Sequence, residues 1–451
     1  MDKIISLLNP WWRDGTVRPE LRKDFIRDAF GECWGHMETR QVVVISGLRR
    51  VGKTTIIYQM IEKLIRGGAD PENILYFSFD ERRDGIRHIL EEYASSLGKD
   101  IEKGRYFVFL DEIQKHAGWT DELKLLYDAL PGIKFVVSGS AALHLEKRGR
   151  ESLAGRIFFT RVEPLSFGEW LRMRGVDFKP EKAELFENRI KPRLLEYMST
   201  PFPEIIDWKG ERVRKYIKET IVERAVFRDI PQEFGDADHS LLEDLLQIFY
   251  SNPGAYLNVD SLAMELGRSK LTIRNHIHYL RFSFLIRMLG NYRGSRRSAS
   301  RKMRRIYPYC PALSAGEDAE LPRLVENLVV SALGAESYWR ERDSEVDAVC
   351  GGLPIEVKYK NKIDSHDLRG LRSCMKMLGL RRGIVVSKDS ASSLKEPEGD
   401  IEIEPAWKFL VRPDSIAANG TCAGPMQTGM SGGKGRRREA VTGRQQAKQE
   451  R

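Results

Sequence analysis

Apolar runs of strand length alternate with amphipathic stretches in the first third of the chain. The runs lie at residues 41–46, 74–79, 106–110, 134–137 and 157–162. Between the first two, residues 54–66 show the spacing of an amphipathic helix that ends at two glycines. Unbroken apolar strands interleaved with helices are typical of a parallel sheet that is covered on both faces. The pattern therefore predicts an α/β fold for this part of the chain.

The pattern changes further along the chain. Residues 167–234 are helical in spacing throughout, and residues 241–305 fit three helices followed by a basic hairpin. A helix over residues 323–334 leads into further strands and helices up to about residue 385. From residue 415 the composition is rich in Gly, Ser, Gln, Lys and Arg, which predicts disorder.

The overall composition is that of a globular protein. The chain has 451 residues, of which 41% are hydrophobic and 31% charged, and this length favours about three domains. No apolar run approaches the roughly 18–20 residues of a membrane-spanning helix, and the N-terminus lacks a signal pattern. The five cysteines are far apart, odd in number and without a C-x-x-C spacing, which argues against a zinc ribbon. We expect a soluble, cytoplasmic protein with no membrane partner.

The net charge of +9 is concentrated in two segments. Residues 287–305 carry eight Lys and Arg and no acid, and residues 415–451 carry seven against two acids, so that the remainder is net negative. We therefore expect that these two segments, rather than the whole molecule, form a basic surface for a partner.

A phosphate-binding motif lies between the first strand and the first helix. The sequence Gly-Leu-Arg-Arg-Val-Gly-Lys-Thr at residues 47–54 matches G-x-x-x-x-G-K-[ST] at every fixed position. Glycines let backbone N–H groups surround phosphates, a lysine reaches the β/γ oxygens, and the threonine hydroxyl can ligate Mg²⁺. The predicted nucleotide-binding residues are Gly47, Leu48, Arg49, Arg50, Val51, Gly52, Lys53, Thr54, Thr55 and Ser138.

Two acids follow the third strand and complete the predicted catalytic set. Asp111 is expected near the Mg²⁺ bound by Thr54, and Glu112 is positioned to polarise an attacking water. Ser138, at the end of the fourth strand, either bonds the γ-phosphate or belongs to a turn in which Ser140 caps a helix. Arg156 is the candidate for offsetting transition-state charge, from the same chain or a neighbour; the alternative is an ordinary surface arginine.

These motifs, together with Phe-Leu-Asp-Glu-Ile-Gln (109–114), Ser-Gly-Ser (138–140), Ser-Leu-Ala-Gly-Arg (152–156) and Glu-Pro-Leu-Ser-Phe (163–167), resemble a known family. The chain resembles archaeal and bacterial AAA-type ATPases in which a winged helix and a restriction-nuclease-like module of unassigned function follow the nucleotide domain. The resemblance covers about residues 5–390. It implies an additional-strand ATPase sheet that binds ATP with Mg²⁺, and it says little about biological role.

A helix-turn-helix is predicted after the helical region. Residues 259–267 fit a short helix that a glycine ends, and Ser269 can cap a second helix through residue 281. Ile273, Ile277 and Leu280 recur at helical spacing and should be buried, which turns five polar side chains outward: Lys270, Arg274, Asn275, His278 and Arg281. Residues 285–307 would form the wing, and its charge favours DNA over the alternative of protein packing.

An acidic hairpin is predicted around Gly351-Gly352. A two-residue turn pairs Cys350 with Leu353, and this register places Asp347 opposite Glu356 and Glu345 opposite Lys358. The arrangement is the D…E-x-K pattern of restriction-type nucleases, and Glu326 matches the extra acid of the family. Asp347 and Glu356, with Lys358, form a candidate second metal site; the alternative is a salt-bridged, inactive face.

The fold class predicted is α/β: an AAA-type P-loop NTPase sheet, an all-helical segment, a winged helix-turn-helix and a small restriction-nuclease-like domain. We expect a Mg²⁺-dependent ATPase that is associated with DNA, with an ATP-gated nuclease and a protein-binding nucleotide switch as the alternatives. A homo-oligomer is compatible with this expectation. The catalytic residues predicted are Lys53, Asp111, Glu112 and Arg156. The predicted segments are 1–38 (N-terminal helical), 39–166 (P-loop ATPase), 167–235 (helical lid), 236–310 (winged helix), 311–413 (nuclease-like) and 414–451 (basic tail).

Overall fold

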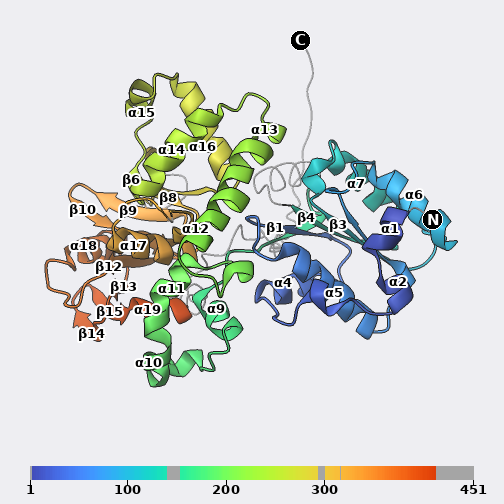
Figure 1. Ribbon diagram of the computed structural model, residues 1–451. Coiled ribbons are helices and arrows are strands. Elements are labelled where there is room, and N and C mark those ends of the chain that lie inside the picture. Colours follow the sequence, from blue (N-terminus) through green and yellow to red (C-terminus); the bar gives the residue numbers. More distant parts are fainter. Residues whose placement is uncertain (1–2, 140–152, 293–299, 315, 413–451) are drawn as a thin grey trace, which may run out of the picture.

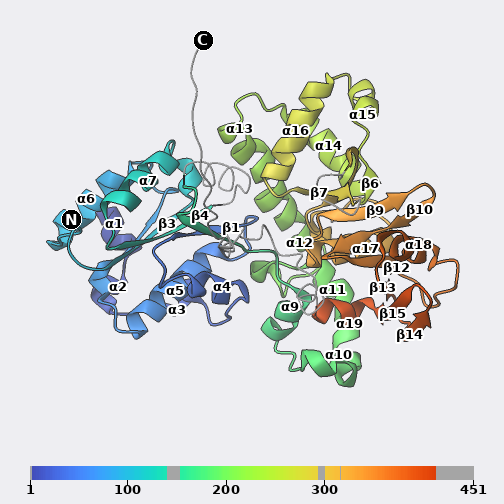
Figure 2. The ribbon, with the colours of Figure 1, turned by 180° about the vertical axis from the view of Figure 1, so that it is seen from behind.

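The computed structural model of the protein describes residues 3–139, 153–292, 300–314 and 316–412. The first lobe holds the elements up to residue 161, and the second holds the later ones (Figures 1 and 2). The predicted basic tail, Ser140 and residues 293–299 of the predicted wing lie outside the described residues.

Five parallel strands form the sheet of the first lobe. The strand order is β2-β3-β4-β1-β5, and every neighbouring pair is parallel. The strands are β1 (Val42–Ser46), β2 (Ile74–Ser78), β3 (Tyr106–Asp111), β4 (Ile133–Gly139) and β5 (Ile157–Arg161). The predicted parallel sheet is therefore confirmed, and its carboxyl edge is the end of β1 from which the glycine-rich loop leaves.

The two faces of this sheet pack into separate cores. Val43 and Ile45 of β1 belong to the core that contains Ile56 of α5, whereas Val42 and Val44 belong to the core of α6 and α7. This alternation is what a strand buried on both faces requires. The helices of the lobe are α1 (Lys3–Leu8), α2 (Trp11–Asp14), α3 (Pro19–Arg22), α4 (Ala29–Gly35), α5 (Lys53–Arg66), α6 (Ile86–Leu97) and α7 (Trp119–Ala129).

The connection to the second lobe is helical, as predicted. Ser166 and Glu169 form a capping box that starts α9, because each side chain accepts from the other's backbone N–H. Two π-helical segments, Lys218–Val222 and Ala225–Asp229, lie between α12 and α13. The α-helices of this connection are α9 (Phe167–Met173), α10 (Glu187–Ile190), α11 (Leu194–Ser199), α12 (Glu211–Ile217) and α13 (Ile230–Glu233).

Three helices and three strands follow. The Ser269 side chain accepts from the backbone N–H of Thr272 and caps α16, and Ile273, Ile277 and Leu280 are buried. Both features match the prediction. The elements are α14 (His239–Ser251), β6 (Ala255–Tyr256), α15 (Val259–Glu265), α16 (Lys270–Phe282), β7 (Ile286–Asn291) and β8 (Ser300–Pro308).

The hairpin β7–β8 does not stand alone. It lies inside a five-stranded sheet of order β10-β9-β7-β8-β6, in which β7 runs parallel to β9. The strands β9 (Ser337–Glu341) and β10 (Ser344–Val346) come from the C-terminal part of the chain. The predicted wing is therefore joined to the predicted nuclease-like domain by backbone hydrogen bonds, which the sequence pattern did not indicate.

A third sheet has the order β11-β12-β13-β15-β14. Its strands are β11 (Ala348–Cys350), β12 (Leu353–Lys358), β13 (Arg382–Ser387), β14 (Ser392–Glu396) and β15 (Gly399–Pro405). The helices of this region are α17 (Leu321–Ala332), α18 (Arg369–Leu378) and α19 (Ala406–Val411). Regular structure thus continues past the predicted end near residue 385. Among the described residues, no helix is both long and apolar enough to cross a bilayer.

Candidate functional site

The glycine-rich loop between β1 and α5 depends on its two glycines. A Cβ at Gly47 would lie 2.2 Å from the carbonyl oxygen of Val162, so no larger residue fits there. Gly52 has a φ of 97°, which L side chains rarely adopt. The fixed letters of the motif are therefore required by the backbone as well as by the phosphate chemistry.

Lys53, the first residue of α5, points back into this loop. Its Nζ donates to the carbonyl oxygens of Gly47 and Leu48, both at 3.1 Å. Burial lowers the pKa of Lys53, and the charges of Glu112 and Asp111 act in the opposite direction. A nearly desolvated ammonium at the loop is suited to bind phosphate oxygens, because the attraction is screened little by water.

Asp111, at the end of β3, collects the hydroxyls of three other elements. Thr54 Oγ1 donates to Asp111 Oδ2 at 2.7 Å, and the Tyr76 hydroxyl donates to the same oxygen at 3.1 Å. The Ser138 hydroxyl donates to Asp111 Oδ1. The structure thus places Asp111 beside Thr54, as predicted, and it also brings Ser138 to Asp111. The role of Tyr76 was missed, since nothing in its local sequence distinguishes it from a core residue.

Glu112 follows with a left-handed backbone, at φ 54°. The Gln114 side chain donates from Nε2 to Glu112 Oε2 at 2.6 Å. The charge of Glu112 acts on both Lys53 and Arg49, so the carboxylate lies on the loop side of the strand end. Gln114 was part of the quoted motif, but its role as a holder of Glu112 was not predicted.

Charged residues of the helical connection lie near Arg49 of the loop. Arg49 Nη2 donates to Asp229 Oδ1 at 2.6 Å, and its Nε also contacts that carboxylate. Burial lowers the pKa of Arg224, and Arg49 and Arg228 add to this effect. Burial likewise lowers the pKa of Lys115 to about 8, again with contributions from Arg49 and Arg228. Sequence reasoning missed this cluster, because its members are distant along the chain.

Arg156 lies at the opposite edge of the sheet. Its backbone carbonyl accepts from the N–H of Val42, at the start of β1, whereas the loop follows the end of β1. Its guanidinium donates to both carboxylate oxygens of Asp128, at 3.0 and 3.1 Å. The structure therefore does not bring Arg156 to the loop of its own chain. A catalytic role for Arg156 stays a prediction, and only for a neighbouring chain.

Arg27 links the phosphate-binding loop to the motif at residues 163–167. The buried Arg27 donates to Glu169 Oε1 at 2.7 Å, to the carbonyl of Val51 at 2.5 Å and to the carbonyl of Glu163 at 2.9 Å. One guanidinium thus joins the loop, the motif and α9.

The helix α16 presents most of the polar side chains expected on its surface. Lys270, Arg274 and His278 are exposed, while Asn275 and Arg281 are half-buried. Lys270 pairs with Asp260 at 2.6 Å. A groove of about 690 Å³ lies between this helix and the strand pair, and four of its lining residues are basic or imidazole side chains: Arg274, His278, Arg281 and Arg304.

Two basic residues of the predicted wing are not available to a partner. Arg287 is 10% exposed at its side chain, contacts Glu163 at 3.5 Å and lies over the Tyr309 ring. Arg305 is 5% exposed and points into a group of carboxylates. The expectation that the whole wing is a solvated basic surface is therefore wrong for these two positions.

The acidic hairpin forms with part of its predicted register. Cys350 pairs with Leu353, and Ala348 with Ile355. Asp347 precedes β11 and accepts from the N–H of Val357 at 2.8 Å, so it does lie beside Glu356.

The other half of the predicted register is wrong. Glu345 is on β10 and pairs with Arg340 of β9, because the chain leaves one sheet and enters another at Asp347. Lys358 pairs with Glu356 instead of Glu345.

The carboxylates of this region are held in an environment that disfavours charge. Burial raises the pKa of Glu326 to about 7, and the charge of Asp347 adds to the effect. Burial and Asp347 likewise raise the pKa of Glu356 well above its usual range. Glu326, Asp347 and Glu356 are thus brought together, as the D…E-x-K hypothesis requires.

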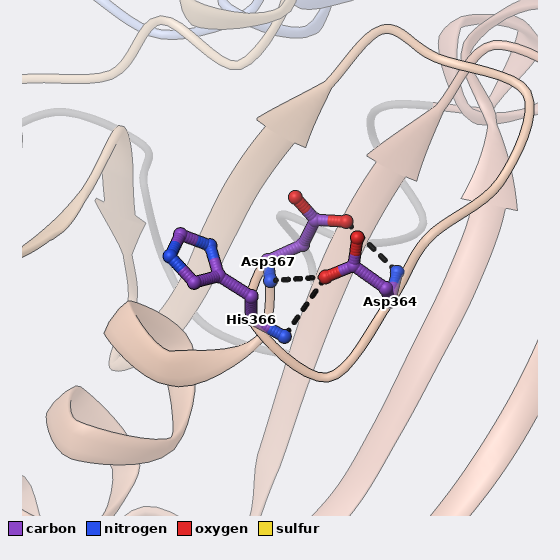
Figure 3. A group of neighbouring side chains, drawn as sticks. All are labelled: Asp364, His366 and Asp367. Atoms are coloured by element: carbon purple, nitrogen blue, oxygen red, sulfur yellow. Dashed lines mark hydrogen bonds between the residues drawn. The ribbon is translucent and has the colours of Figure 1, made fainter.

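A second acidic group, Asp364, His366 and Asp367, lies on the surface before α18 (Figure 3). Asp364 Oδ1 accepts from the backbone N–H groups of His366 and Asp367, at 2.9 and 3.2 Å. Asp367 Oδ2 accepts from the N–H of Asp364 and from Lys360 Nζ, at 2.8 and 2.7 Å. These bonds are those of a tight turn that leads into a helix, and they account for the cluster without an ion.

Comparison with known proteins divides the chain into two matched regions. Residues 39–171 match a family model described as an AAA domain, and residues 197–315 match a domain of unknown function (DUF8612).

Relatives are found among uncharacterized proteins of Methanocaldococcus jannaschii. MJ1544 is 24% identical over 397 residues, which cover 82% of this chain and 88% of the relative. MJ1637 is 26% identical over 295 residues, or 60% of each chain. Among solved structures, the ORC2 protein of Aeropyrum pernix in its ADP form is 15% identical, with a TM-score of 0.34, over 67% of this chain and 94% of that one. That score is too low to carry an argument about function.

Proposed function

We propose that this chain, whose residues 39–171 form an AAA-type P-loop ATPase domain, hydrolyses ATP with Mg²⁺ and couples hydrolysis to DNA. The observation that carries the first part is the 2.7 Å hydrogen bond between Thr54 and Asp111, beside the buried Lys53. A hydroxyl and a carboxylate at the end of a phosphate loop are the oxygen donors that Mg²⁺ prefers. When bound there, Mg²⁺ would neutralise charge on the phosphates.

The protein's own side chains supply the remaining chemistry. Lys53 and the loop N–H groups would bind and orient the phosphates, and Glu112 would orient the attacking water and take up its proton. Gln114 would fix the Glu112 carboxylate in one rotamer through the 2.6 Å hydrogen bond. Ser138, which donates to Asp111, would report the loss of the γ-phosphate.

The coupling element proposed is the helical segment that ends at Asp229. Arg49 of the loop pairs with Asp229, and α13 and α14 follow directly along the chain. A change of charge at the loop alters the partners available to Arg49, so the position of this segment would depend on the bound nucleotide.

The region 236–310 is proposed to be a winged helix that binds DNA. The order of α14, β6, α15, α16, β7 and β8, with β6 paired to β8, supports this identification. The basic lining of the groove beside α16 favours a phosphate backbone as its ligand.

One observation favours a protein partner instead. Met264 and Leu271 are 84% and 67% exposed, and both lie on the helices of the predicted helix-turn-helix. Exposed apolar side chains of this kind are typical of surfaces that dock on another protein. Stimulation of ATP turnover by duplex DNA separates the two proposals, since a purely protein-binding switch would not respond to DNA.

The nuclease alternative rests on Asp347, Glu356 and Lys358, which lie together as the D…E-x-K pattern requires. Nicking of supercoiled DNA with Mn²⁺, lost in both Asp347→Asn and Lys358→Ala, would favour it. The primary proposal is tested by ATP hydrolysis with and without duplex DNA, in the parent and in Glu112→Gln. A parent that hydrolyses no ATP under either condition would contradict it.

A further inference from the structure

A single guanidinium lies at the centre of the C-terminal carboxylates. Arg305 Nη2 donates to Glu326 Oε1 at 2.5 Å, and Nη1 donates to Asp347 Oδ1 at 3.0 Å. Nη1 also lies 3.1 Å from Glu345 Oε1. The three acids come from α17, from β10 and from the residue that joins β10 to β11, whereas Arg305 comes from β8 of the hairpin.

Neighbouring groups bond to this guanidinium and to its carboxylate partner, and a glycine leaves room beside it. Its Nε donates to the carbonyl of Gly254 at 2.8 Å, and the Tyr307 hydroxyl donates to Glu326 Oε1 at 2.7 Å. A Cβ at Gly254, where φ is 82°, would lie 2.8 Å from Arg305 Nη2 and 3.0 Å from Glu326 Oε1. A larger residue at Gly254 would be strained at this φ and would crowd the guanidinium, so the local backbone favours the buried position of Arg305.

Four carboxyl groups gather around two basic side chains at this place. Glu326, Glu345, Asp347 and Glu356 meet Arg305 and Lys358. Glu356 is 5% exposed, and its Oε2 is buried without a hydrogen-bond partner among the described residues. A buried carboxylate oxygen without a donor is costly, and it is the kind of group that a cation satisfies.

We propose that Arg305 occupies the place of a divalent cation, and that the carboxylates Glu326, Asp347 and Glu356 bind Mn²⁺ or Mg²⁺ once this guanidinium is displaced. Oxygen donors from three carboxylates suit a hard divalent cation, and a cation held there would favour the ionised forms of Glu326 and Glu356. The guanidinium and the cation exclude each other, because both need the same oxygens of Glu326 and Asp347.

Arg305 belongs to strand β8, so the exclusion of the cation depends on the position of that strand. Arg304, its neighbour on β8, lines the groove beside α16, while Arg305 points into the carboxylates. A ligand that shifts β8 would therefore move the guanidinium as well. The acidic site is closed in this conformation and opens only with the hairpin. This inference does not depend on ATP hydrolysis, and its test contains no nucleotide.

The test is Mn²⁺ binding to the full-length protein, measured from the loss of the free Mn²⁺ signal in electron paramagnetic resonance. The variants are the parent, Arg305→Gln, and Arg305→Gln combined with Glu356→Gln. Arg340→Gln is the matched control, because Arg340 also lies near Glu345 but contacts neither Glu326 nor Asp347. Circular dichroism and the melting temperature are recorded for each variant with and without Mn²⁺.

We expect Arg305→Gln to bind one Mn²⁺ per chain more than the parent, and to gain melting temperature with Mn²⁺. The additional Glu356→Gln change should remove both effects, and Arg340→Gln should behave as the parent does. An Arg305→Gln protein that is folded and binds no additional Mn²⁺ would overturn the proposal. A parent that binds Mn²⁺ in a manner dependent on Glu356 would also overturn it, because Arg305 would then exclude nothing.

Replacement of the buried Arg305 guanidinium can destabilise the fold, so two further variants at this position are measured. Arg305→Ala leaves space for a small guanidinium, and ethylguanidinium should raise its melting temperature and compete with Mn²⁺. Arg305→Lys keeps a charge but lacks the fork that reaches two carboxylates, and it should bind Mn²⁺ more weakly than Arg305→Ala. Failure of ethylguanidinium to compete with Mn²⁺ would show that the two cations do not share a site.

Discussion

Arg49 and Asp229 form a two-point ion pair across 180 residues of sequence, with Nη2 2.6 Å from Oδ1. The pair joins the phosphate-binding loop to the π-helical segment Ala225–Asp229, which lies between α12 and α13 of the second lobe. It is largely buried, at 12% and 18% side-chain exposure, so each partner depends on the other for charge compensation. The loop and the second lobe are thus in direct electrostatic contact.

The first prediction concerns this pair. Asp229→Asn should leave Arg49 free to turn toward bound phosphates, so ATP affinity should stay within about threefold while the response of turnover to DNA is lost. The measurement is steady-state ATP hydrolysis with and without duplex DNA. Glu402→Gln, which breaks an exposed pair with Arg382, is the matched control and should respond to DNA normally. Full stimulation in Asp229→Asn would remove this pair from the coupling.

Gln114 provides the second prediction. Gln114→Leu removes the donor that holds Glu112, so kcat should fall by about tenfold or more, with KM for ATP little changed. Gln114→Glu should be worse, because a second carboxylate would repel Glu112. The split between kcat and KM distinguishes positioning from a general loss of structure. Equal kcat in the parent and Gln114→Leu would show that Glu112 needs no holder.

DNA binding by the groove beside α16 is the third prediction. Replacing Arg274 and Arg281 with alanine should weaken binding to unrelated duplexes alike, and should flatten the salt dependence by about one unit per lost phosphate contact. Affinity is measured at several salt concentrations by fluorescence anisotropy. Arg381→Ala combined with Arg382→Ala, at the C-terminal sheet, removes the same number of charges and controls for net charge. A salt slope unchanged from the parent would favour a protein ligand for this surface.

The fourth prediction is a pH dependence of stability. Glu326 has a pKa of about 7 in the folded protein because burial disfavours its charged form, against 4.5 when unfolded. Between these two values the folded state still binds the proton, whereas the unfolded state has released it. The stabilisation that comes from this proton is complete below pH 4.5 and is lost as the pH rises through 7. Glu326→Gln should therefore flatten the fall in melting temperature between pH 5 and 7.5. An identical slope in parent and variant would contradict the assignment.

The geometry of the phosphate-binding motif could be predicted from the sequence, because its determinants are local. Gly47, Gly52, Lys53 and Thr54 occupy fixed positions in one loop, and a parallel sheet brings the end of β3 with Asp111 to the same edge. The order of strands and the motif are enough for that inference. The Tyr76 hydroxyl was not foreseen, because its contact depends on the packing of β2 beside β3.

Contacts between distant segments account for the errors. The pairing of Glu345 with Lys358 assumed that an alternating strand continues, whereas the chain changes sheets at Asp347. Arg305 was counted with a basic wing, because charge alone does not say which side of a strand faces a neighbouring domain. Its partners lie 21 to 42 residues further along the chain, and only the shared sheet of β7, β8 and β9 brings them together.

The central claim is that Lys53, Thr54, Asp111 and Glu112 form a working ATPase site. The most direct measurement is ATP turnover and ATP affinity in the parent, Lys53→Ala and Glu112→Gln, with Glu91→Gln as an acid-to-amide control on the surface of α6. We expect Lys53→Ala to lose binding and turnover, and Glu112→Gln to bind ATP normally while turnover falls by about 100-fold or more. Hydrolysis by Glu112→Gln at the parent rate would contradict the account.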